Sequence, residues 1–361
     1  MFKKVVRPIL FLFPHERTQE FLLRLLHVVA KVAPLRWLLN KRYTYRHPSL
    51  EREVFGVKFD NPIGLAAGFD RNAVCYRDFK SLGFGFVEVG TVTPSRQAGN
   101  QRPRIFRLPE DEALISRTGY PNNGLESAVA RLRRRGYGKK IVVGASIAKN
   151  RNVSPDKAAG DYLRLFRNLY QYVDYCTVNF KQLIREAESM GVSDAEIKSL
   201  LENILNDLFE FRRGQNQYLP ILLKVSPDWS NERIDDIVDI LIATPLDGLM
   251  VAGTTMSREG LKTSAKVLNN QIGGGGLSGE PLLPRTLELI RYVHDKMNGM
   301  YPIIGVGGVM TAEDAKAMLD AGASLVQVYT GLIYNGPTFA KNICKHLVES
   351  EGGSVQGRHN S

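Results

Sequence analysis

The sequence predicts a TIM barrel, a closed ring of eight parallel strands that alternate with helices, with a small helical segment before it. Three observations predict this fold: eight short β-rich apolar runs, helical patterns after most of them, and continuous apolarity typical of strands buried on both faces. A doubly wound sheet is the less favoured alternative. The runs are PIGLAAG (62–68), GFVEVGTV (85–92), IVVGASI (141–147), YCTVN (175–179), ILLKV (221–225), DGLMVAG (247–253), PIIGVGG (302–308) and SLVQVYTG (324–331).

Helix starts can be read between these strands. Ser193 with Glu196 and Thr311 with Asp314 have the spacing of a capping box, and Ser230 has the position of an N-cap. In a capping box the first side chain accepts a backbone N–H of the first turn and the acidic side chain reaches back. These signals predict helices that begin near 194, 231 and 312.

The segment 1–46 differs from the rest of the chain in charge. It carries ten Lys or Arg against two acids, +8 of a total formal charge of +11. Phe21, Leu25, Val28, Val29 and Val32 recur at helical spacing, and Pro34 ends this helix. A basic amphipathic segment can lie on an anionic membrane surface, but its apolar face can equally dock on the main domain. We assign 1–46 to this segment, 47–350 to the barrel and 351–361 to a disordered tail.

Several classes of protein are not expected. The longest early apolar run, 9–13, is far shorter than a membrane span and lacks a signal cleavage site, so we expect no secretion. Cys75, Cys176 and Cys344 are odd in number and scattered, which favours buried free thiols over disulfides or a metal site. Basic residues are not interleaved with aromatics in a recognition motif, so we expect no nucleic-acid partner.

The candidate site lies where the barrel strands end, because active sites of this fold are built from the loops after the strands. Two glycine-rich turns fall there, Gly305–Gly308 and Gly275–Gly279, together with Tyr329–Gly331. Turns of this kind let backbone N–H groups approach a phosphate. The sequence therefore predicts an anionic ligand at this rim.

Charged residues sit at two other strand ends. Lys224 lies inside an apolar strand, where an unpaired lysine is costly to bury. It can stabilise negative charge on a cofactor at the barrel mouth, or its ammonium can snorkel to water. The turn LAAGFDR ends in Asp70 and Arg71 and suits a flat ring lying against backbone, although an ordinary turn with a capping Asp has the same pattern.

These segments resemble the class 2, quinone-linked dihydroorotate dehydrogenases over nearly the whole chain. The resemblance is carried by NPIGLAAGFD, GFVEVGTVTPSRQAGNQRPRIFRL, PILLKVSPD, GGLSGEPL and PIIGVGGVMTAEDAKAMLDAGASLVQVYTGLIYNGP. It implies an FMN-dependent dehydrogenase of pyrimidine biosynthesis that oxidises dihydroorotate to orotate. It also implies that the N-terminal helices form the quinone side, with the protein peripheral on the cytoplasmic face of the membrane.

The resemblance assigns roles residue by residue. The quinone side falls on Gln19, where the family has a histidine, and on Arg107. The substrate side falls on Arg71, Ser116, Asn179, Ile184, Gly253 and Thr254. The FMN contacts fall on Ala67, Gly68, Thr91, Ser146, Asn179, Lys224, Gly279, Gly308, Tyr329 and Thr330.

The sequence departs from the family at the catalytic loop. The family's strand ends in Asn followed by Ser-Ser-Pro-Asn-Thr, and the second serine removes the C5 proton while the C6 hydride moves to the flavin. Here Asn179 is followed by Phe180, Lys181, Gln182, Leu183 and Ile184, so Gln182 holds the serine position. An amide has no basic lone pair for this task. Lys181 is the nearest titratable candidate, with Gln182 and Arg71 as the other catalytic positions.

Substrate positions depart as well. Three family asparagines read Ser116, Ile184 and Gly253, the FMN asparagine reads Ser146, and the family lysine reads Arg71. Each lost hydrogen bond to a polar ring costs about 1–3 kcal/mol.

Three hypotheses follow from these departures. The protein oxidises dihydroorotate with a substitute base, Lys181 or Ser189; or it is an FMN oxidoreductase of another small substrate; or it binds flavin without turnover. A flavin that dihydroorotate bleaches, one that only another donor bleaches, and one inert to every donor distinguish the three.

Overall fold

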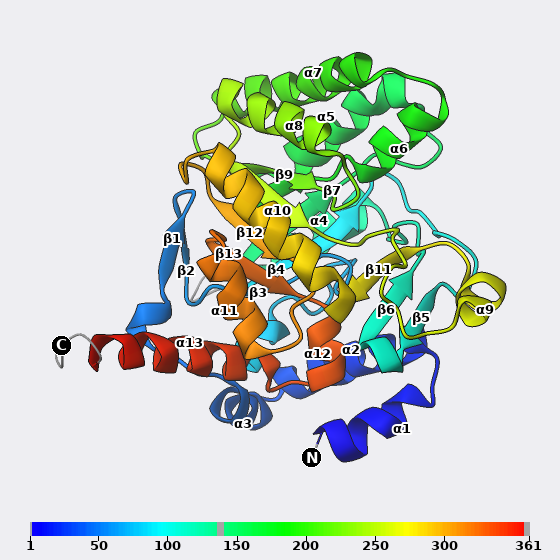
Figure 1. The fold of residues 1–361 in the computed structure, drawn as a ribbon. Coiled ribbons are helices and arrows are strands. Elements are labelled where there is room, and N and C mark those ends of the chain that lie inside the picture. The colour runs from blue at the N-terminus through cyan, green and yellow to red at the C-terminus, as the bar shows by residue number, and fades with distance from the viewer. Residues whose placement is uncertain (1, 136–140, 357–361) are drawn as a thin grey trace.

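The computed structural model describes residues 2–135 and 141–356 and closes the eight predicted strands into a barrel (Figure 1). All neighbouring barrel strands are parallel, in the order β10-β12-β13-β3-β4-β7-β8-β9. The predicted TIM barrel is therefore confirmed. The strands are β3 (Ile63–Leu65), β4 (Phe86–Val92), β7 (Val142–Ile147), β8 (Tyr175–Val178), β9 (Ile221–Val225), β10 (Gly248–Ala252), β12 (Ile303–Val306) and β13 (Leu325–Val328).

The barrel interior is filled in layers, because alternate residues of each strand point inward. The lower layer is apolar and consists of Phe86, Tyr175, Leu222, Met250, Ile304 and Leu325. The next layer, two residues further along the strands, is polar and contains Glu88, Thr177, Lys224 and Gln327. The polar layer lies toward the strand ends, where the predicted site should be.

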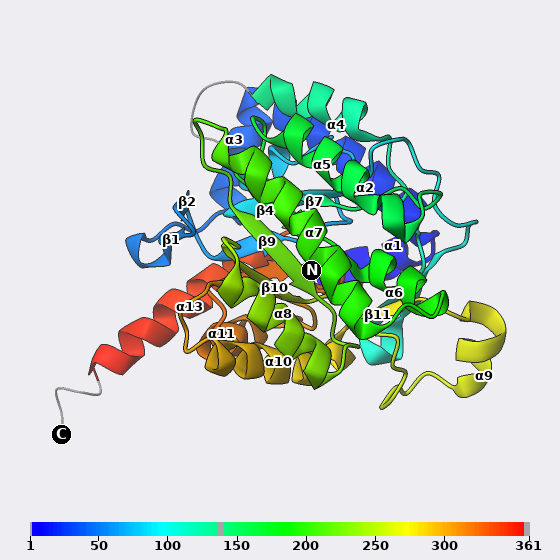
Figure 2. The same cartoon turned by 90° about the horizontal axis from the view of Figure 1, so that it is seen from above.

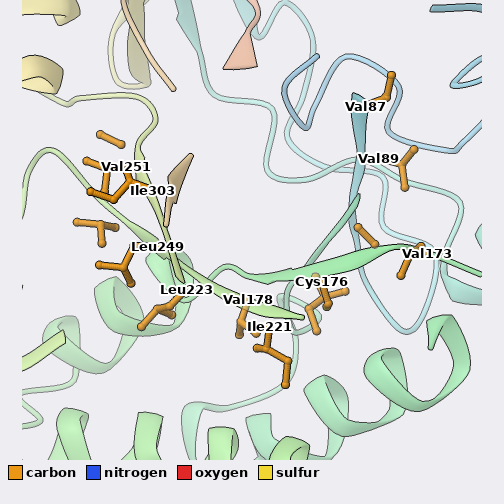
Figure 3. Close-up of a cluster of buried hydrophobic side chains, with 14 of the residues drawn as sticks. Val87, Val89, Val173, Cys176, Val178, Ile221, Leu223, Leu249, Val251 and Ile303 are labelled. Atoms are coloured by element: carbon orange, nitrogen blue, oxygen red, sulfur yellow. The ribbon is translucent and has the colours of Figure 1, made fainter. Parts of the chain in front are cut away.

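The outer face of the barrel packs against a ring of helices (Figure 2). Residues that alternate with the inward ones, such as Val87, Leu223 and Leu249, are fully buried between strands and helices (Figure 3). The helices after the strands are α4 (Leu125–Leu132), α5 (Ala158–Leu169), α6 (Lys181–Ser189), α7 (Asp194–Arg213), α8 (Asn231–Ala243), α10 (Leu283–Lys296), α11 (Ala312–Asp320), α12 (Thr330–Asn335) and α13 (Phe339–Gln356).

The predicted helix starts are confirmed. Ser193 and Glu196 form a complete capping box at the start of α7, and Thr311 and Asp314 form one at α11. Ser230 accepts the backbone N–H of Arg233 at the start of α8. Local sequence therefore fixes where these helices begin.

The N-terminal segment forms η1 (Phe2–Val6), α1 (Arg7–Phe11), α2 (His15–Lys31) and α3 (Ala33–Tyr43), which lie beside the barrel next to α12 and α13 (Figure 1). The apolar stripe predicted for α2 faces outward, because Phe21, Leu25, Val28 and Val32 are 61%, 47%, 60% and 46% exposed. Leu23 and Leu26, which lie off that stripe, pack on the core. The segment therefore docks on the main domain through a different face from the one that the sequence indicated.

Two small sheets lie outside the eight-strand pattern. β1 (Arg52–Val54) and β2 (Val57–Phe59) form a hairpin whose Phe59 packs edge-on against Phe86 of the barrel interior, closing the end opposite the strand C-termini. β5 (Ile105–Leu108), β6 (Ala113–Ser116) and β11 (Gly276–Gly279) form an antiparallel sheet over the carboxyl ends. This second sheet provides one wall of the site.

The expected tail requires a correction. The final helix α13 continues through Gln356, so the boundary placed at residue 350 falls inside a helix. Residues 357–361 lie outside the described part of the chain.

Candidate active site

A cavity of about 500 Å³ opens at the carboxyl ends of the barrel strands. It is lined by segments that follow seven of the eight barrel strands and by the β5-β6-β11 sheet. Most of the site residues expected from the sequence line this one cavity: Ala67, Gly68, Arg71, Thr91, Ser116, Asn179, Lys181, Gln182, Lys224, Gly253, Thr254, Gly279, Gly308, Tyr329 and Thr330.

The floor of the cavity is the polar layer of the barrel. The Glu88 Oε2 atom accepts hydrogen bonds from Tyr175 (3.2 Å), Thr177 (3.1 Å) and the Gln327 amide (3.0 Å). Burial raises the pKa of Glu88, and the nearby Lys224 opposes this rise. Burial also lowers the pKa of Lys224, and Glu88 opposes that decrease. Each of the two groups therefore opposes the shift that burial imposes on the pKa of the other.

Two side-chain oxygens of this polar layer, Oε1 of Glu88 and Oε1 of Gln327, have no hydrogen-bond partner among the described residues. Gln327 is 1% exposed and lines the cavity, and its Oε1 accepts no hydrogen bond from any described residue. A buried amide oxygen left without a donor costs roughly 1–3 kcal/mol. A ligand with an N–H or O–H group that reaches the floor would satisfy this oxygen.

The glycine turns form close-packed walls. At Gly308 an added Cβ would lie 2.4 Å from the Leu283 Cα, and at Gly279 (φ +108°) it would lie 2.4 Å from the carbonyl oxygen of Glu112. Between them the Ser278 and Thr330 hydroxyls are 2.9 Å apart. Only glycine fits these positions, and the backbone itself forms the wall that a ligand would contact.

The wall after β4 joins two predicted cofactor positions. The Thr91 and Ser146 hydroxyl oxygens lie 3.0 Å apart. Ser146 is fully buried and does not line the cavity, so it supports Thr91 from behind. The direct cofactor contact at Ser146 stays a prediction.

After β8 the chain enters a helix directly. The predicted catalytic loop is the first turn of α6, which begins at Lys181. The Asn179 Oδ1 accepts the backbone N–H of Lys181 (3.2 Å), while its amide donates to the Tyr120 hydroxyl (3.4 Å). Asn179 therefore orients both the strand end and the first residue of the helix.

Lys181 is a lysine with a perturbed environment. Its Nζ lies 3.2 Å from Asp228 Oδ2 and 2.5 Å from the carbonyl oxygen of Thr254. Burial lowers its pKa below the usual 10.5, the neighbouring Lys224 and Arg185 charges lower it further, and Asp228 opposes the shift. A lysine with a lowered pKa at a cavity wall can act as a proton acceptor.

The other residues of α6 are less suited to proton transfer. The Gln182 amide lines the cavity and donates to Glu186 Oε1 (2.7 Å). Ser189, the alternative base, is exposed at the far end of α6 and bonds the Glu186 carbonyl (2.7 Å). The substrate contact expected at Ile184 is corrected here. Its side chain is 1% exposed within the apolar core and does not line the cavity.

The charged side chains that line the cavity are all basic, although Glu88 lies near Lys224 and Asp228 is paired with Lys181. The described lining residues include the five cations Arg71, Arg117, Lys181, Arg185 and Lys224 and no Asp or Glu. Such a wall focuses positive potential into a space of low dielectric constant. The cavity is therefore built for a ligand of net negative charge.

The quinone-side candidates lie outside this cavity, between the N-terminal helices and the barrel. Gln19 donates to the Phe69 carbonyl (3.0 Å), and Arg107 donates to the carbonyl oxygens of Phe11 (3.1 Å) and Phe13 (2.8 Å). Between them lies His15, which is 6% exposed. Burial is the main cause that lowers the pKa of His15 to about 3, and the charges of Arg107 and Arg71 lower it further, whereas the Gln19 amide opposes the shift. This neutral histidine has no hydrogen bond to either ring nitrogen among the described residues.

Sequence reasoning missed several lining residues. Tyr120 is half-buried beside Asn179, and burial raises its pKa. Gln327 had a readable signal, because it alternates with apolar residues along an inward-facing strand. Arg185 lies at the mouth one turn after Lys181, as helical spacing would place it.

No cluster of His, Cys, Asp and Glu suited to a metal ion occurs in residues 2–135 and 141–356. In the same ranges, no helix combines the length and apolarity that crossing a bilayer requires.

Known proteins resemble this chain over most of its length. The family model described as dihydroorotate dehydrogenase matches residues 49–350. A dihydroorotate dehydrogenase (quinone) of Christiangramia forsetii is 43% identical over 349 residues, 97% of this chain and 99% of that protein. One of Coxiella burnetii is 41% identical over 317 residues, 87% of this chain and 88% of that protein.

A solved structure has the same fold. The dihydroorotate dehydrogenase of Eimeria tenella in complex with ferulenol has a TM-score of 0.76 and 32% identity, covering 90% of this chain and 91% of that one. Fold and site together define a (β/α)8-barrel protein with a cavity lined by basic residues at the strand ends. With the comparisons, the chain belongs to the dihydroorotate dehydrogenase family.

Proposed function

We propose that this protein is an FMN-dependent oxidoreductase that converts dihydroorotate to orotate and passes the electrons to a quinone. The observation that carries the proposal is the cavity itself, in which Lys224 at the floor, the glycine walls and Lys181 with its lowered pKa surround one space lined by basic residues. The family relatives named for this reaction support it.

The residues present fit FMN. The walls at Gly279 and Gly308 allow close approach of a phosphate, with the Thr330 hydroxyl beside them. Lys224 at the floor would face the electron-rich edge of the ring, and the free Gln327 oxygen would accept a ring N–H. When bound, FMN supplies the hydride acceptor for the reaction.

The chain's own residues supply charge and proton transfer. Arg71 would bind the substrate carboxylate, since a guanidinium matches carboxylate geometry. Lys181 in its neutral form would take the C5 proton, and Asp228 and the Thr254 carbonyl fix the position of its Nζ. The lysine thus replaces the serine that the resemblance led us to expect at the position of Gln182.

The N-terminal helices would carry the quinone and membrane functions. Exposed apolar side chains gather on them, including Leu12, Phe13, Phe21, Val28, Trp37 and Leu38. The segment is also strongly basic. An apolar face with basic flanks binds the surface of an anionic membrane, so we propose peripheral association on the cytoplasmic face.

The test is an anaerobic titration of the purified yellow protein with dihydroorotate, followed by flavin absorption. We expect bleaching in the wild type and in Lys316→Ala, a half-exposed lysine of α11 outside the cavity, and none in Lys181→Ala. Full bleaching of Lys181→Ala would remove Lys181 as the base. Protein purified without flavin, and unable to take it up, would contradict the cofactor.

One observation on the cavity wall suggests a second candidate function, which the relatives do not favour. Gly253 has no side chain, Ile184 lies in the core and Ser116 is short, so the wall offers none of the three amides that would hold a pyrimidine ring. An FMN oxidoreductase of another small anion fits this wall. A flavin that stays oxidised with dihydroorotate but is bleached by dithionite would select this alternative.

A further inference from the structure

The N-terminal helix α2 contacts the active-site cavity through one carboxylate. Glu16, in the first turn of α2, is 9% exposed and lies against three arginines of the barrel domain. Its Oε1 lies 3.4 Å from Arg71, its Oε2 lies 3.2 Å from Arg102, and Arg104 contacts both oxygens at 3.0 and 3.2 Å. Of these arginines, Arg71 lines the cavity.

Arg104 holds the Glu16 carboxylate firmly, whereas Arg71 contacts it only weakly. The Arg104 side chain is 6% exposed and also donates to the carbonyl oxygens of Ala98 and Asn100, both at 2.8 Å. It therefore fixes the Glu16 carboxylate with respect to the barrel. Arg71 is the weaker partner, held by a single nitrogen at 3.4 Å. A guanidinium held through one nitrogen keeps its other donors for a second anion.

We propose that Glu16 is a positioning residue for Arg71, so that the N-terminal helix α2 sets the affinity of the cavity for its anionic substrate. The inference rests on the proposed function in taking Arg71 as the group that binds the substrate carboxylate. Without Glu16, Arg71 faces Arg104 and Arg102 with no carboxylate to fix it, and like charges drive it from its place. A displacement of about 1 Å at a binding group can cost up to about a hundredfold in rate.

The coupling runs in both directions. Any movement of α2 against the barrel, for example on binding a membrane surface, would move Glu16 and with it Arg71. By linkage, an anion bound at Arg71 would strengthen or weaken the docking of α2 by the same factor.

The experiment compares Glu16→Gln with Glu20→Gln in the full-length flavoprotein. Glu20 is a matched control, because it lies on the same helix and pairs with Arg102 at 3.0 Å, but has no contact with Arg71 among the described residues. Glutamine has nearly the same shape as glutamate, so the substitution leaves no empty space beside Arg104. Equal thermal unfolding temperatures for the variants would show that the fold is kept.

The first readout needs no substrate. Phenylglyoxal modifies free guanidinium groups, and peptide mass spectrometry gives the rate at Arg71. We expect Glu16→Gln to raise this rate about tenfold and Glu20→Gln to leave it unchanged. An unchanged rate at Arg71 in Glu16→Gln would overturn the inference.

The second readout is the dissociation constant of orotate, from the change in flavin absorption. We expect a rise of about tenfold in Glu16→Gln, with turnover at saturating substrate kept, and no effect of Glu16→Gln once Arg71 is Ala. An equal effect in both backgrounds would show a merely structural role and overturn the inference. If wild-type protein binds no orotate, the proposed substrate fails, and the labelling of Arg71 alone decides the positioning role.

Discussion

At the scale of single residues, the site combines the cofactor positions that the resemblance assigned with a lysine that we propose as the proton acceptor. Lys224, Gly279, Gly308 and Thr330 line the cavity where the resemblance placed the flavin. Lys181 differs from the family serine in chemistry as well as size. A serine needs help to lose its proton, whereas a lysine accepts a proton as soon as it is neutral.

This difference predicts a pH profile. The pKa of Lys181 is lowered below 10.5, so the neutral form that accepts a proton is scarce below that pKa and abundant above it. Flavin reduction by dihydroorotate should therefore become faster as pH rises from neutral to about 10, and level off above the Lys181 pKa. Stopped-flow absorption at saturating substrate measures the rate.

Lys181→Arg provides the control for the pH profile. Arginine keeps the positive charge but stays protonated throughout this range, so the rate should fall by at least about a hundredfold. A Lys181→Arg enzyme with the wild-type rate and pH profile would show that another group accepts the proton.

The residues of the site could be predicted to different extents. Positions on strand ends were predictable, because a barrel brings all eight ends to one face regardless of the loops. Ile184 was not, since whether a residue after Asn179 faces the cavity or the core depends on the chain entering a helix at once. The Lys181 and Asp228 pair joins residues 47 positions apart, and no local pattern indicates such a contact.

At the scale of elements, strands and capped helices followed from local sequence, while the additions to the barrel did not. The alternation of Phe86 and Val87 between interior and exterior is a period-two pattern that sequence carries. The pairing of β11 with β6 joins segments about 160 residues apart through only four residues each. Short strands of this kind have too few residues to show a period.

Buried charge between elements predicts a stability effect far from the cavity. Arg212 at the end of α7 is 6% exposed and donates to Asp247 Oδ2 (2.6 Å), just before β10. Asp247 also accepts the backbone N–H of Ile221 (2.8 Å), at the start of β9. Asp247→Asn leaves the arginine charge buried without a counter-ion, and should lower the free energy of unfolding by about 3 kcal/mol. Urea denaturation measures this loss.

The matched control is Asp236→Asn, which removes the partner of Lys198 in a half-exposed pair. It should cost less than about 1 kcal/mol, because exposed ion pairs gain little over water. Equal losses in the two variants would contradict the argument that burial decides the value of the pair. Neither residue lines the cavity, so flavin binding should be kept in both.

At the scale of the whole molecule, the chain joins a reaction cavity to an apolar surface. The cavity opens at the carboxyl ends of the strands. The basic N-terminal helices lie beside the same barrel (Figure 1), and they carry exposed apolar side chains. Arg71 and Glu16 are the contact between the two. A substrate in water and an electron acceptor in lipid can thus be served by one protein without a membrane-crossing helix in its described part.

The exposed face of α2 gives the last prediction. Phe21 and Val28 are 61% and 60% exposed, and burying each in the interface of a bilayer would contribute about 1.5 kcal/mol. The double variant Phe21→Gln, Val28→Gln should therefore bind vesicles of anionic phospholipid at least about tenfold more weakly, as co-sedimentation would show. Flavin reduction by dihydroorotate should be unchanged, because neither side chain lines the cavity.

The matched control is the double variant Met190→Gln, Met300→Gln. These two side chains have similar exposure but lie away from α2, so the variant should leave vesicle binding intact. If both double variants bind vesicles as the wild type does, α2 is not the membrane-facing surface, and the apolar stripe would have to serve another contact.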